Sequence, residues 1–313
     1  MKTRIKKSGS ASQPATIRRD FKKNKYKYLL VLPVIAYFLI FHYKAMYGII
    51  IAFKRYRASA GIERSPWVGL YNFERFFHDI YFWRVLRNTL SISFLTLIFS
   101  FPAPILLALL INEVRVKWFK RTVQTISYMP HFIAMVVVCS LIQSFCQTNG
   151  VLNDIIVFFG GERDNLLANK DYFYAIYIIS GIWQSIGWNS IIYLAALSGI
   201  DQEQYEAARV DGAGRLKQMF YITLPGLLPT ISMLLVLNLG SMLNVGYEKI
   251  LLLYSELTYE VADVISTYVY RKGLIDSDFS FATAVGLFNS IINVIFLLTA
   301  NKISKKMGQS GLF

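Results

Sequence analysis

Amide, hydroxyl and aromatic side chains recur at helical spacing inside stretches of the sequence that are otherwise apolar. Asn189 and Tyr193 are four residues apart, and so are Asn289 and Asn293, so each pair lies on one face of a helix. With neighbours of the same types the set comprises Gln184, Trp188, Asn189, Tyr193, Asn238, Ser241, Asn244, Tyr247, Asn289 and Asn293. Amides donate and accept hydrogen bonds, and aromatic rings offer a flat apolar face. These residues can therefore bind a solute rich in hydroxyl groups without forming a covalent bond.

The same residue types also serve helix packing, since amides and hydroxyls hydrogen-bond across neighbouring helices. An amide in hydrocarbon is costly unless it faces a cavity or a polar partner. For each of these residues the sequence leaves two interpretations open, contact with a solute or hydrogen bonding between helices.

Residues for covalent chemistry or metal binding do not cluster in the sequence. The P-loop, H-E-x-x-H, Cys-x-x-Cys and G-x-S-x-G patterns do not occur, so the chain does not bind ATP through a P-loop. His42, His78 and His131 have no second histidine or cysteine at metal-ligand spacing. Cys139 and Cys146 would lie about 10 Å apart along a helix, too far for a disulfide, and we expect them to be packing residues. We predict no catalytic residue, no metal site and no cofactor on this chain.

Long apolar runs indicate which elements position the polar residues. Of the 313 residues, 55% are hydrophobic, gathered into runs of about 20 or more, the length of a helix that crosses ~30 Å of hydrocarbon. We predict an all-α membrane protein with six transmembrane helices, at residues 28–53, 85–111, 122–145, 173–197, 222–245 and 281–300. The first run follows a basic segment, as in a signal peptide, but it is too long and lacks a cleavage pattern.

The distribution of basic residues predicts the orientation. Residues 1–27, 112–121, 199–221 and the C-terminal tail carry 20 Lys and Arg against six acids, whereas residues 54–84, 146–172 and 246–280 carry 11 against 13. Both termini are therefore expected in the cytoplasm. The expected organisation is a flexible basic tail at 1–27, a six-span domain at 28–301 and a cytoplasmic tail at 302–313. The net charge of +14 does not indicate nucleic acid, because the bases follow the span ends rather than one face.

The predicted cytoplasmic loop at 199–221 is the most patterned polar segment of the chain. From 201 to 217, Ala and Leu recur at helical spacing beside a charged face, and Gly212 and Gly214 interrupt the pattern. This predicts a short amphipathic helix, a bend that glycine permits, and a second short helix leading into the next span. Glu206, Arg209 and Lys217 can fix the orientation of such a hairpin in a groove of another protein.

A resemblance to a known family appears in this loop. The pattern Glu-Ala-Ala, three residues, Gly, nine residues, Ile-x-Leu-Pro extends without a gap from Glu206 to Pro225. It resembles the signature of the permease subunits of binding-protein-dependent ABC importers, in which this loop is the coupling helix that seats in a cleft of the ATPase subunit. The resemblance implies coupling roles for Glu206, Ala207, Ala208, Arg209, Asp211, Gly212, Gly214, Lys217, Leu224 and Pro225.

The resemblance extends over most of the chain. WVGLYNFERFF (67–77) and LRNTL (86–90) are similar to carbohydrate-type permeases, and residues 46–56, 246–274 and 279–293 resemble the branch that imports oligosaccharides and polysaccharide fragments. Ala45 stands where that family usually has a proline. The implied fold is the type I permease bundle, in the bacterial cytoplasmic membrane. The implied partners are a second permease, two ATPase subunits that bind ATP and Mg²⁺, and an extracytoplasmic solute-binding protein.

The resemblance implies import by alternating access, with energy entering through the coupling loop, which agrees with the near absence of acids from the predicted spans. The six bases of 54–84 indicate either a preference for acidic sugars or docking of a partner. An ABC permease for a solute other than a sugar is the main alternative. A membrane-embedded transferase would need clustered acids or histidines, and a receptor or channel would leave the patterned loop without a role.

Overall fold

Every regular element that the structure describes is a helix. The computed structural model describes residues 23–306 and 308. The longer helices are α2 (Lys25–Tyr37), α6 (Phe82–Phe99), α7 (Pro102–Glu113), α8 (Lys117–Tyr128), α9 (Met135–Cys146), α10 (Val151–Phe158), α11 (Lys170–Ser198), α12 (Gln202–Val210), α14 (Leu224–Leu239) and α18 (Phe279–Lys306). The shorter ones are η1 (Phe38–Tyr43), α3 (Lys44–Met46), η2 (Tyr47–Phe53), α4 (Gly61–Arg64), α5 (Tyr71–Phe77), η3 (Met129–Phe132), α13 (Arg215–Gln218), η4 (Met219–Thr223), α15 (Tyr247–Leu253), η5 (Glu256–Thr258), α16 (Tyr259–Ala262), α17 (Ile265–Tyr270) and η6 (Arg271–Ile275).

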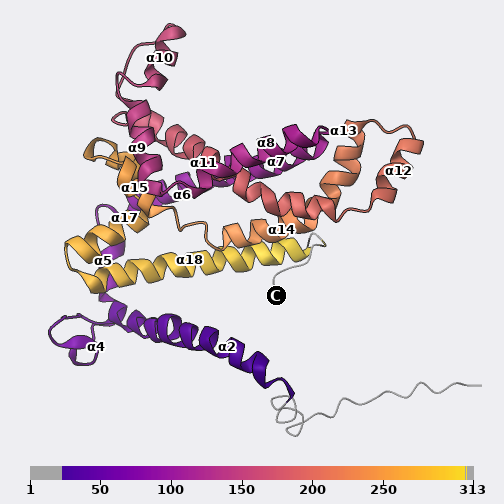
Figure 1. The fold of residues 1–313 in the computed structure, drawn as a ribbon. Coiled ribbons are helices and arrows are strands. Elements are labelled where there is room, and N and C mark those ends of the chain that lie inside the picture. Colours follow the sequence, from indigo (N-terminus) through magenta and orange to yellow (C-terminus); the bar gives the residue numbers. More distant parts are fainter. Residues whose placement is uncertain (1–22, 307, 309–313) are drawn as a thin grey trace, which may run out of the picture.

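Five helical stretches within the described residues are long and apolar enough to cross a membrane. They are Lys25–Phe53, Phe82–Glu113, Met135–Phe158, Arg215–Leu239 and Phe279–Lys306. The predicted span at 173–197 corresponds to α11, a single helix of 29 residues. It is not one of the five stretches, and its Gln, Asn, Ser and Trp residues interrupt its apolar residues. Helices α7, α8, α11, α14 and α18 lie roughly side by side, whereas α9 stands across one end of the bundle and α2 diverges from the others (Figure 1).

The first span contacts the rest of the bundle mainly at one end. Its last turn, η2, packs against α18, and Ala52 is the buried residue of the stretch. In the single chain, no residue of α2 is buried. The span therefore presents apolar surface on all sides.

Prolines explain two departures from the predicted spans. The predicted helix at 85–111 is divided into α6 and α7, and Pro102 begins α7, where its missing N–H costs no helical hydrogen bond. The prediction of one continuous helix at 122–145 is wrong. The chain forms α8, the 3₁₀ turn η3 with Pro130, and then α9, because proline disrupts a continuing helix.

Helix α11 is central to the bundle and packs against α6, α7, α8 and α14. Its approach to α8 needs glycine, since a Cβ on Gly187 would lie 2.1 Å from the backbone oxygen of Ser127. Tyr193 and Leu197 join Ala108 and other residues of α7 and α14 in one apolar cluster. These contacts hold α11 in a fixed position against α7.

The segment 246–280 forms a separate set of short helices around Asp263, which is fully buried. The carboxylate of Asp263 pairs with Arg84 of α6 at 2.9 Å and with Arg271 at 2.7 Å, and it accepts a hydrogen bond from Thr267. Asn88 of α6 donates to the Asp263 backbone oxygen over 3.0 Å. These bonds fix the segment on the first turns of α6.

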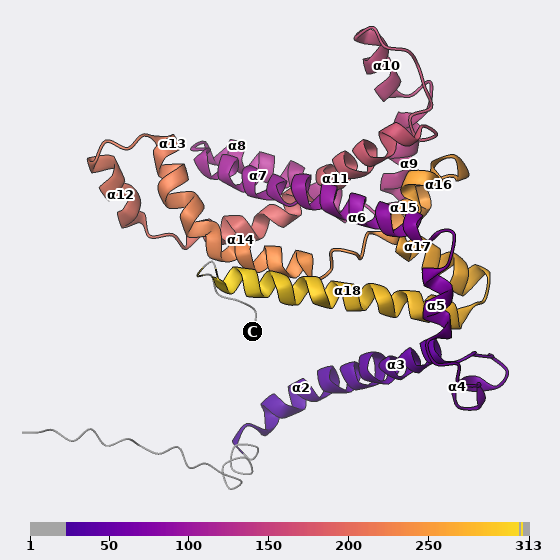
Figure 2. The ribbon, with the colours of Figure 1, turned by 180° about the vertical axis from the view of Figure 1, so that it is seen from behind.

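The predicted cytoplasmic and outer segments lie at opposite ends of the bundle. Both views show α12, α13 and the end of α7 at one end, with α5, α10 and α15 to α17 at the other (Figure 1, Figure 2). Among the segments predicted to be cytoplasmic, the end of α18 also lies with α12 and α13.

Candidate functional site

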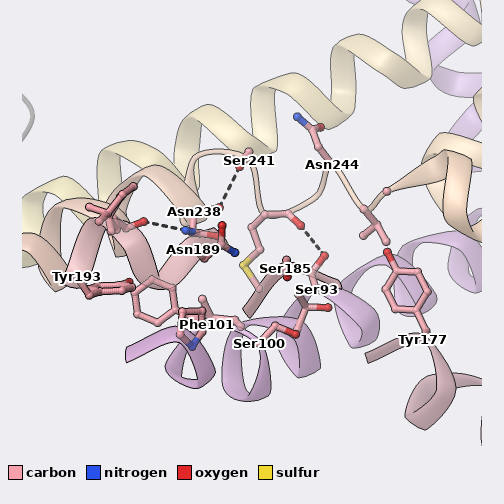
Figure 3. Close-up of a pocket in the computed structure, with 18 residues that line it drawn as sticks. Ser93, Ser100, Phe101, Tyr177, Ser185, Asn189, Tyr193, Asn238, Ser241 and Asn244 are labelled. Atoms are coloured by element: carbon pink, nitrogen blue, oxygen red, sulfur yellow. Dashed lines mark hydrogen bonds between the residues drawn. The ribbon is translucent and has the colours of Figure 1, made fainter. Parts of the chain in front are cut away.

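A cavity of about 400 Å³ opens between α6, α11, α14 and the turn after α14 (Figure 3). Polar side chains from all four segments line it, together with apolar residues such as Phe101, Ile192 and Leu234. The polar lining residues are Ser93, Thr96, Ser100, Tyr177, Ser185, Asn189, Tyr193, Asn238, Ser241 and Asn244. Tyr193 and Tyr177 lie at opposite ends of this group (Figure 3). The lining contains no Asp, Glu, Lys or Arg.

Half of the ten residues proposed from the sequence to face a solute line this cavity. These five are Asn189, Tyr193, Asn238, Ser241 and Asn244. Asn238 donates to the Leu234 backbone oxygen over 3.0 Å. Ser241 donates to the backbone oxygen of Asn238 over 3.3 Å. The side-chain oxygen of Asn238 and the amide of Asn189 are thus available at the cavity wall.

Asn289 and Asn293 of α18 lie behind the cavity and hold one of its lining residues. Their amide groups donate to the side-chain oxygen of Asn244 over 3.1 and 3.0 Å. The side-chain oxygen of Asn293 accepts from the backbone N–H of Leu243 over 2.9 Å. The pair thus joins α18 to the turn after α14, and neither residue lines the cavity.

Gln184, Trp188 and Tyr247 are not among the residues that line the cavity. The Trp188 ring stacks on His131 of η3, with ring centroids 4.5 Å apart and planes within 2°. Tyr247 packs against Tyr270, with centroids 6.1 Å apart. Trp188 thus joins α11 to the break between α8 and α9.

Sequence reasoning missed the contribution of the second predicted span. Ser93 and Thr96 of α6 and Ser100 just after it all line the cavity, and Ser93 donates to the Met242 backbone oxygen over 2.6 Å. Their spacing of three and four residues is a polar stripe on one helix face. That stripe was the signal that could have identified them.

Lys249 of α15 lies next to the cavity, outside the candidate spans. Its Nζ donates to the Tyr177 backbone oxygen over 2.9 Å and lies 4.7 Å from the centroid of the Tyr177 ring. Burial lowers the pKa of Lys249 from 10.5 to about 8, because the charged form loses hydration. The ammonium group therefore stays mainly protonated at neutral pH.

The loop at 199–221 has the helix, bend and helix that the sequence predicts. Asp201 caps α12 by accepting from the Glu203 N–H over 3.0 Å, and Gly212 adopts a φ of +75°. The Gly212 N–H donates to the Arg209 oxygen over 3.0 Å, and the Ala213 N–H donates to the Ala208 oxygen over 2.8 Å. This pair of bonds is the Schellman motif, which favours glycine at its left-handed position.

The hairpin formed by α12 and α13 stands out from the bundle (Figure 2). Its exposed side chains include Glu206, Arg209 and Lys217, and also apolar Val210, which is 89% exposed. Ala207, Asp211 and Gly214 are exposed as well, Ala208 is half-buried, and Leu224 and Pro225 begin α14. Tyr205 and Thr223 share a hydrogen bond of 3.0 Å between their hydroxyl oxygens, which ties α12 to the base of α14.

Cys139 and Cys146 lie on one side of α9, where both are buried in the same apolar cluster. Within the described residues no three His, Cys, Asp or Glu side chains come together as a metal site.

The sequence and the fold are similar to known transport proteins. The family described as "Binding-protein-dependent transport system inner membrane component" matches residues 81–309. "Polygalacturonan/rhamnogalacturonan transport system permease protein YteP" of Bacillus subtilis (strain 168) is 45% identical over 320 residues, which cover 98% of this chain and 100% of that protein. "Protein LplB" of the same organism is 46% identical and covers 93% of this chain and 92% of its own length.

A solved structure has the same fold over nearly the whole chain. A chain of the "bacterial alginate ABC transporter in complex with alginate pentasaccharide-bound periplasmic protein" is 44% identical, with a TM-score of 0.86, and the match covers 94% of this chain and 99% of that chain.

Proposed function

Because this chain belongs to the family of binding-protein-dependent transport system inner membrane components, we propose that it carries oligosaccharides across the membrane as one permease subunit of an ATP-driven importer. The chain has the type I permease fold of ABC importers. The observation that carries the proposal is the cavity between α6, α11 and α14, lined by amides, hydroxyls and aromatic rings. Its volume of about 400 Å³ falls in the range of ligand pockets.

The chemistry of the lining suits a sugar. Each hydroxyl of a sugar both donates and accepts, as the amides of Asn189 and Asn238 do. The rings of Tyr177 and Tyr193 can cover the apolar C–H face of a sugar ring. We propose that Asn189, Tyr193, Asn238, Ser241 and Asn244 contact the substrate and that Asn289 and Asn293 hold Asn244 in place.

Acidic oligosaccharides are the substrate class that the relatives favour. The names of two of them specify polygalacturonan/rhamnogalacturonan and alginate, and these polymers contain uronate units. Six basic residues in 54–84 add positive charge near the outer end of the bundle. We propose that this chain imports fragments of an acidic polysaccharide.

The energy for transport enters through the hairpin of α12 and α13. Its position at one end of the bundle, its exposed charges and its rigid glycine bend support a role in contacting an ATPase subunit. ATP-driven closure of two such subunits would push on this hairpin and on its counterpart in a second permease, and the pair would rock between inward- and outward-open states. ATP and Mg²⁺ would bind to the ATPase subunits, and this chain would catalyse no reaction.

The proposed topology has six spans, with α11 as the fourth and both termini in the cytoplasm. It is supported by the separation of the basic segments and the outer segments at opposite ends of the bundle. The outer loops would then form the docking face for the solute-binding protein.

Co-purification tests the assembly directly. The tagged chain would be extracted from its native membrane in mild detergent, and the proteins that accompany it identified by mass spectrometry. We expect stoichiometric amounts of a P-loop ATPase and a second permease. Recovery of the chain alone, from a preparation in which other membrane complexes survive, would contradict the proposal. Uptake of an oligogalacturonate into proteoliposomes that contain the complex would then test the substrate class.

A further inference from the structure

Lys249 is a buried cation that the transport cycle proposed above does not use. Lys249 is only 5% exposed. Nζ lies against α11, where it bonds to the Tyr177 backbone oxygen. One turn further along, Gly181 also adjoins it, since a Cβ there would lie in ordinary contact with Nζ, at 3.4 Å. Both helices thus provide a defined position for the ammonium group.

Within the described residues, no acid forms an ion pair with this charge. None of the ion pairs within the described part of the chain includes Lys249, and Glu248 beside it is exposed. Its neighbour Ile250 belongs to an apolar cluster with Cys139 of α9. A buried cation without a counter-ion lowers stability, so stability does not explain why a lysine occupies this position.

Tyr177 contacts Lys249 and also lines the cavity. Nζ is 4.7 Å from the ring centroid, and Tyr177, Val245 and Gly246 all line the cavity near that end. The lining contains no charged side chain, so Lys249 places a positive charge beside this end of the cavity that no lining residue supplies. Little water surrounds the ammonium group, so its field is weakly screened.

We infer that Lys249 makes the cavity selective for oligosaccharides that carry carboxylates, by attracting them through the Tyr177 wall. The inference rests on the proposed function, since it concerns the solute bound in that cavity. A carboxylate in contact with the Tyr177 ring would lie about 8 Å from Nζ, because contact adds ~3.5 Å to the distance of 4.7 Å. At an effective dielectric constant of about 20, with further screening by cavity water, this predicts roughly a tenfold preference.

The test measures uptake of two sugars that differ only in charge. Proteoliposomes would contain the complete importer, with its solute-binding protein added outside. The probes would be trigalacturonate and its methyl ester, in which each carboxylate is neutral. The preference is the uptake rate of the acid divided by that of the ester. It would be compared between the wild-type chain, Lys249→Met, and the control Lys170→Met, which removes the same charge from an exposed position.

We expect Lys249→Met to lower the preference for the acid about tenfold and Lys170→Met to leave it unchanged. The binding protein is the same throughout, so its own selectivity cancels when the preferences are compared. An equal preference in the wild type and Lys249→Met would overturn the inference while leaving the proposed function intact. If the wild-type importer moves neither trisaccharide, the proposed substrate class fails and the inference fails with it. Lys249→Gln would replace the methionine variant if that complex did not assemble, with the same two outcomes.

Discussion

Alanine at Gly212 is predicted to weaken the hairpin formed by α12 and α13, whereas alanine at Gly214 is not. A Cβ at either position would meet nothing within 4 Å, so the two substitutions differ only in backbone conformation. Gly212 has a φ of +75°, where an alanine costs about 1–2 kcal/mol. Gly214 has a φ of −68° and a ψ of 166°, which alanine adopts without strain.

The strain at Gly212 falls on the bonds that end α12. The Ala213 to Ala208 and Gly212 to Arg209 hydrogen bonds both depend on the left-handed turn. A loss of about 1–2 kcal/mol would raise the population of the opened hairpin roughly 5- to 30-fold. The alanine at Gly214 would restrict only the unfolded chain and leave the hairpin as stable or slightly more so.

Hydrogen exchange of the α12 amides in the assembled complex measures this opening directly. We expect exchange 5- to 30-fold faster in Gly212→Ala than in the wild type, and unchanged or slower exchange in Gly214→Ala. In the same preparations, substrate-stimulated ATP hydrolysis should fall in Gly212→Ala alone. Equal exchange in the two variants would refute the conformational argument. Faster exchange with normal stimulation would instead refute the role of the hairpin in coupling.

Three further substitutions probe the packing and charge of the bundle. Gly187→Ala should lower the stability of the complex by about 1–3 kcal/mol, because its Cβ would overlap a backbone oxygen of α8. The control Gly286→Ala, where a Cβ would meet open space on α18, should be neutral or stabilising. Thermal unfolding of the two variants measures the difference. Asp263→Ala should cost about 3 kcal/mol, because it leaves two arginines without their buried partner, and Asp276→Ala, in an exposed pair, should cost less than ~1 kcal/mol. Burial lowers the pKa of Lys249 to about 8, so wild-type stability should rise as the pH increases from 8 to 10.5. Below pH 8 the Lys249→Met variant should therefore be more stable than the wild type by about 3 kcal/mol, and this difference should disappear by pH 10.5.

Each of these predictions has an outcome that contradicts it. Equal melting temperatures for Gly187→Ala and Gly286→Ala would show that α8 and α11 can separate without cost. Equal losses at Asp263 and Asp276 would show that burial adds nothing to the ion pairs of the outer segment. If the difference in stability between the wild type and Lys249→Met did not change with pH, the pKa of Lys249 would be the same in the folded and unfolded states.

The sequence was sufficient for the elements whose cause is local. The bend at Gly212 follows from a glycine within a helical pattern, and α11 follows from an apolar period of suitable length. The break at Pro130 also has a local cause, but the apolar composition around it outweighed the proline in the prediction. Proline inside a membrane helix is tolerated in some contexts, so composition alone does not decide between a kink and a new helix.

The cavity could be predicted only in part, because helical spacing tells which residues share a face and not what that face meets. Asn238 and Asn289 have the same chemistry, yet the first lines the cavity and the second bonds to Asn244. Lys249 was not singled out, because its contact with Tyr177 joins residues 72 positions apart. Such pairs are set by the packing of distant helices.

The polar character of α11 has a consequence for how the protein is made. A helix with several amides and hydroxyls partitions less readily from the translocon into lipid than one built of Leu and Ile. Helix α7 is synthesised earlier, and Ala108 of α7 packs with Tyr193 and Leu197 of α11 in one cluster. As a proposed span, α11 would therefore be retained in the membrane by a helix already inserted there. The residues of α11 that we propose to contact a polar solute would thus make insertion of their own helix depend on a neighbour.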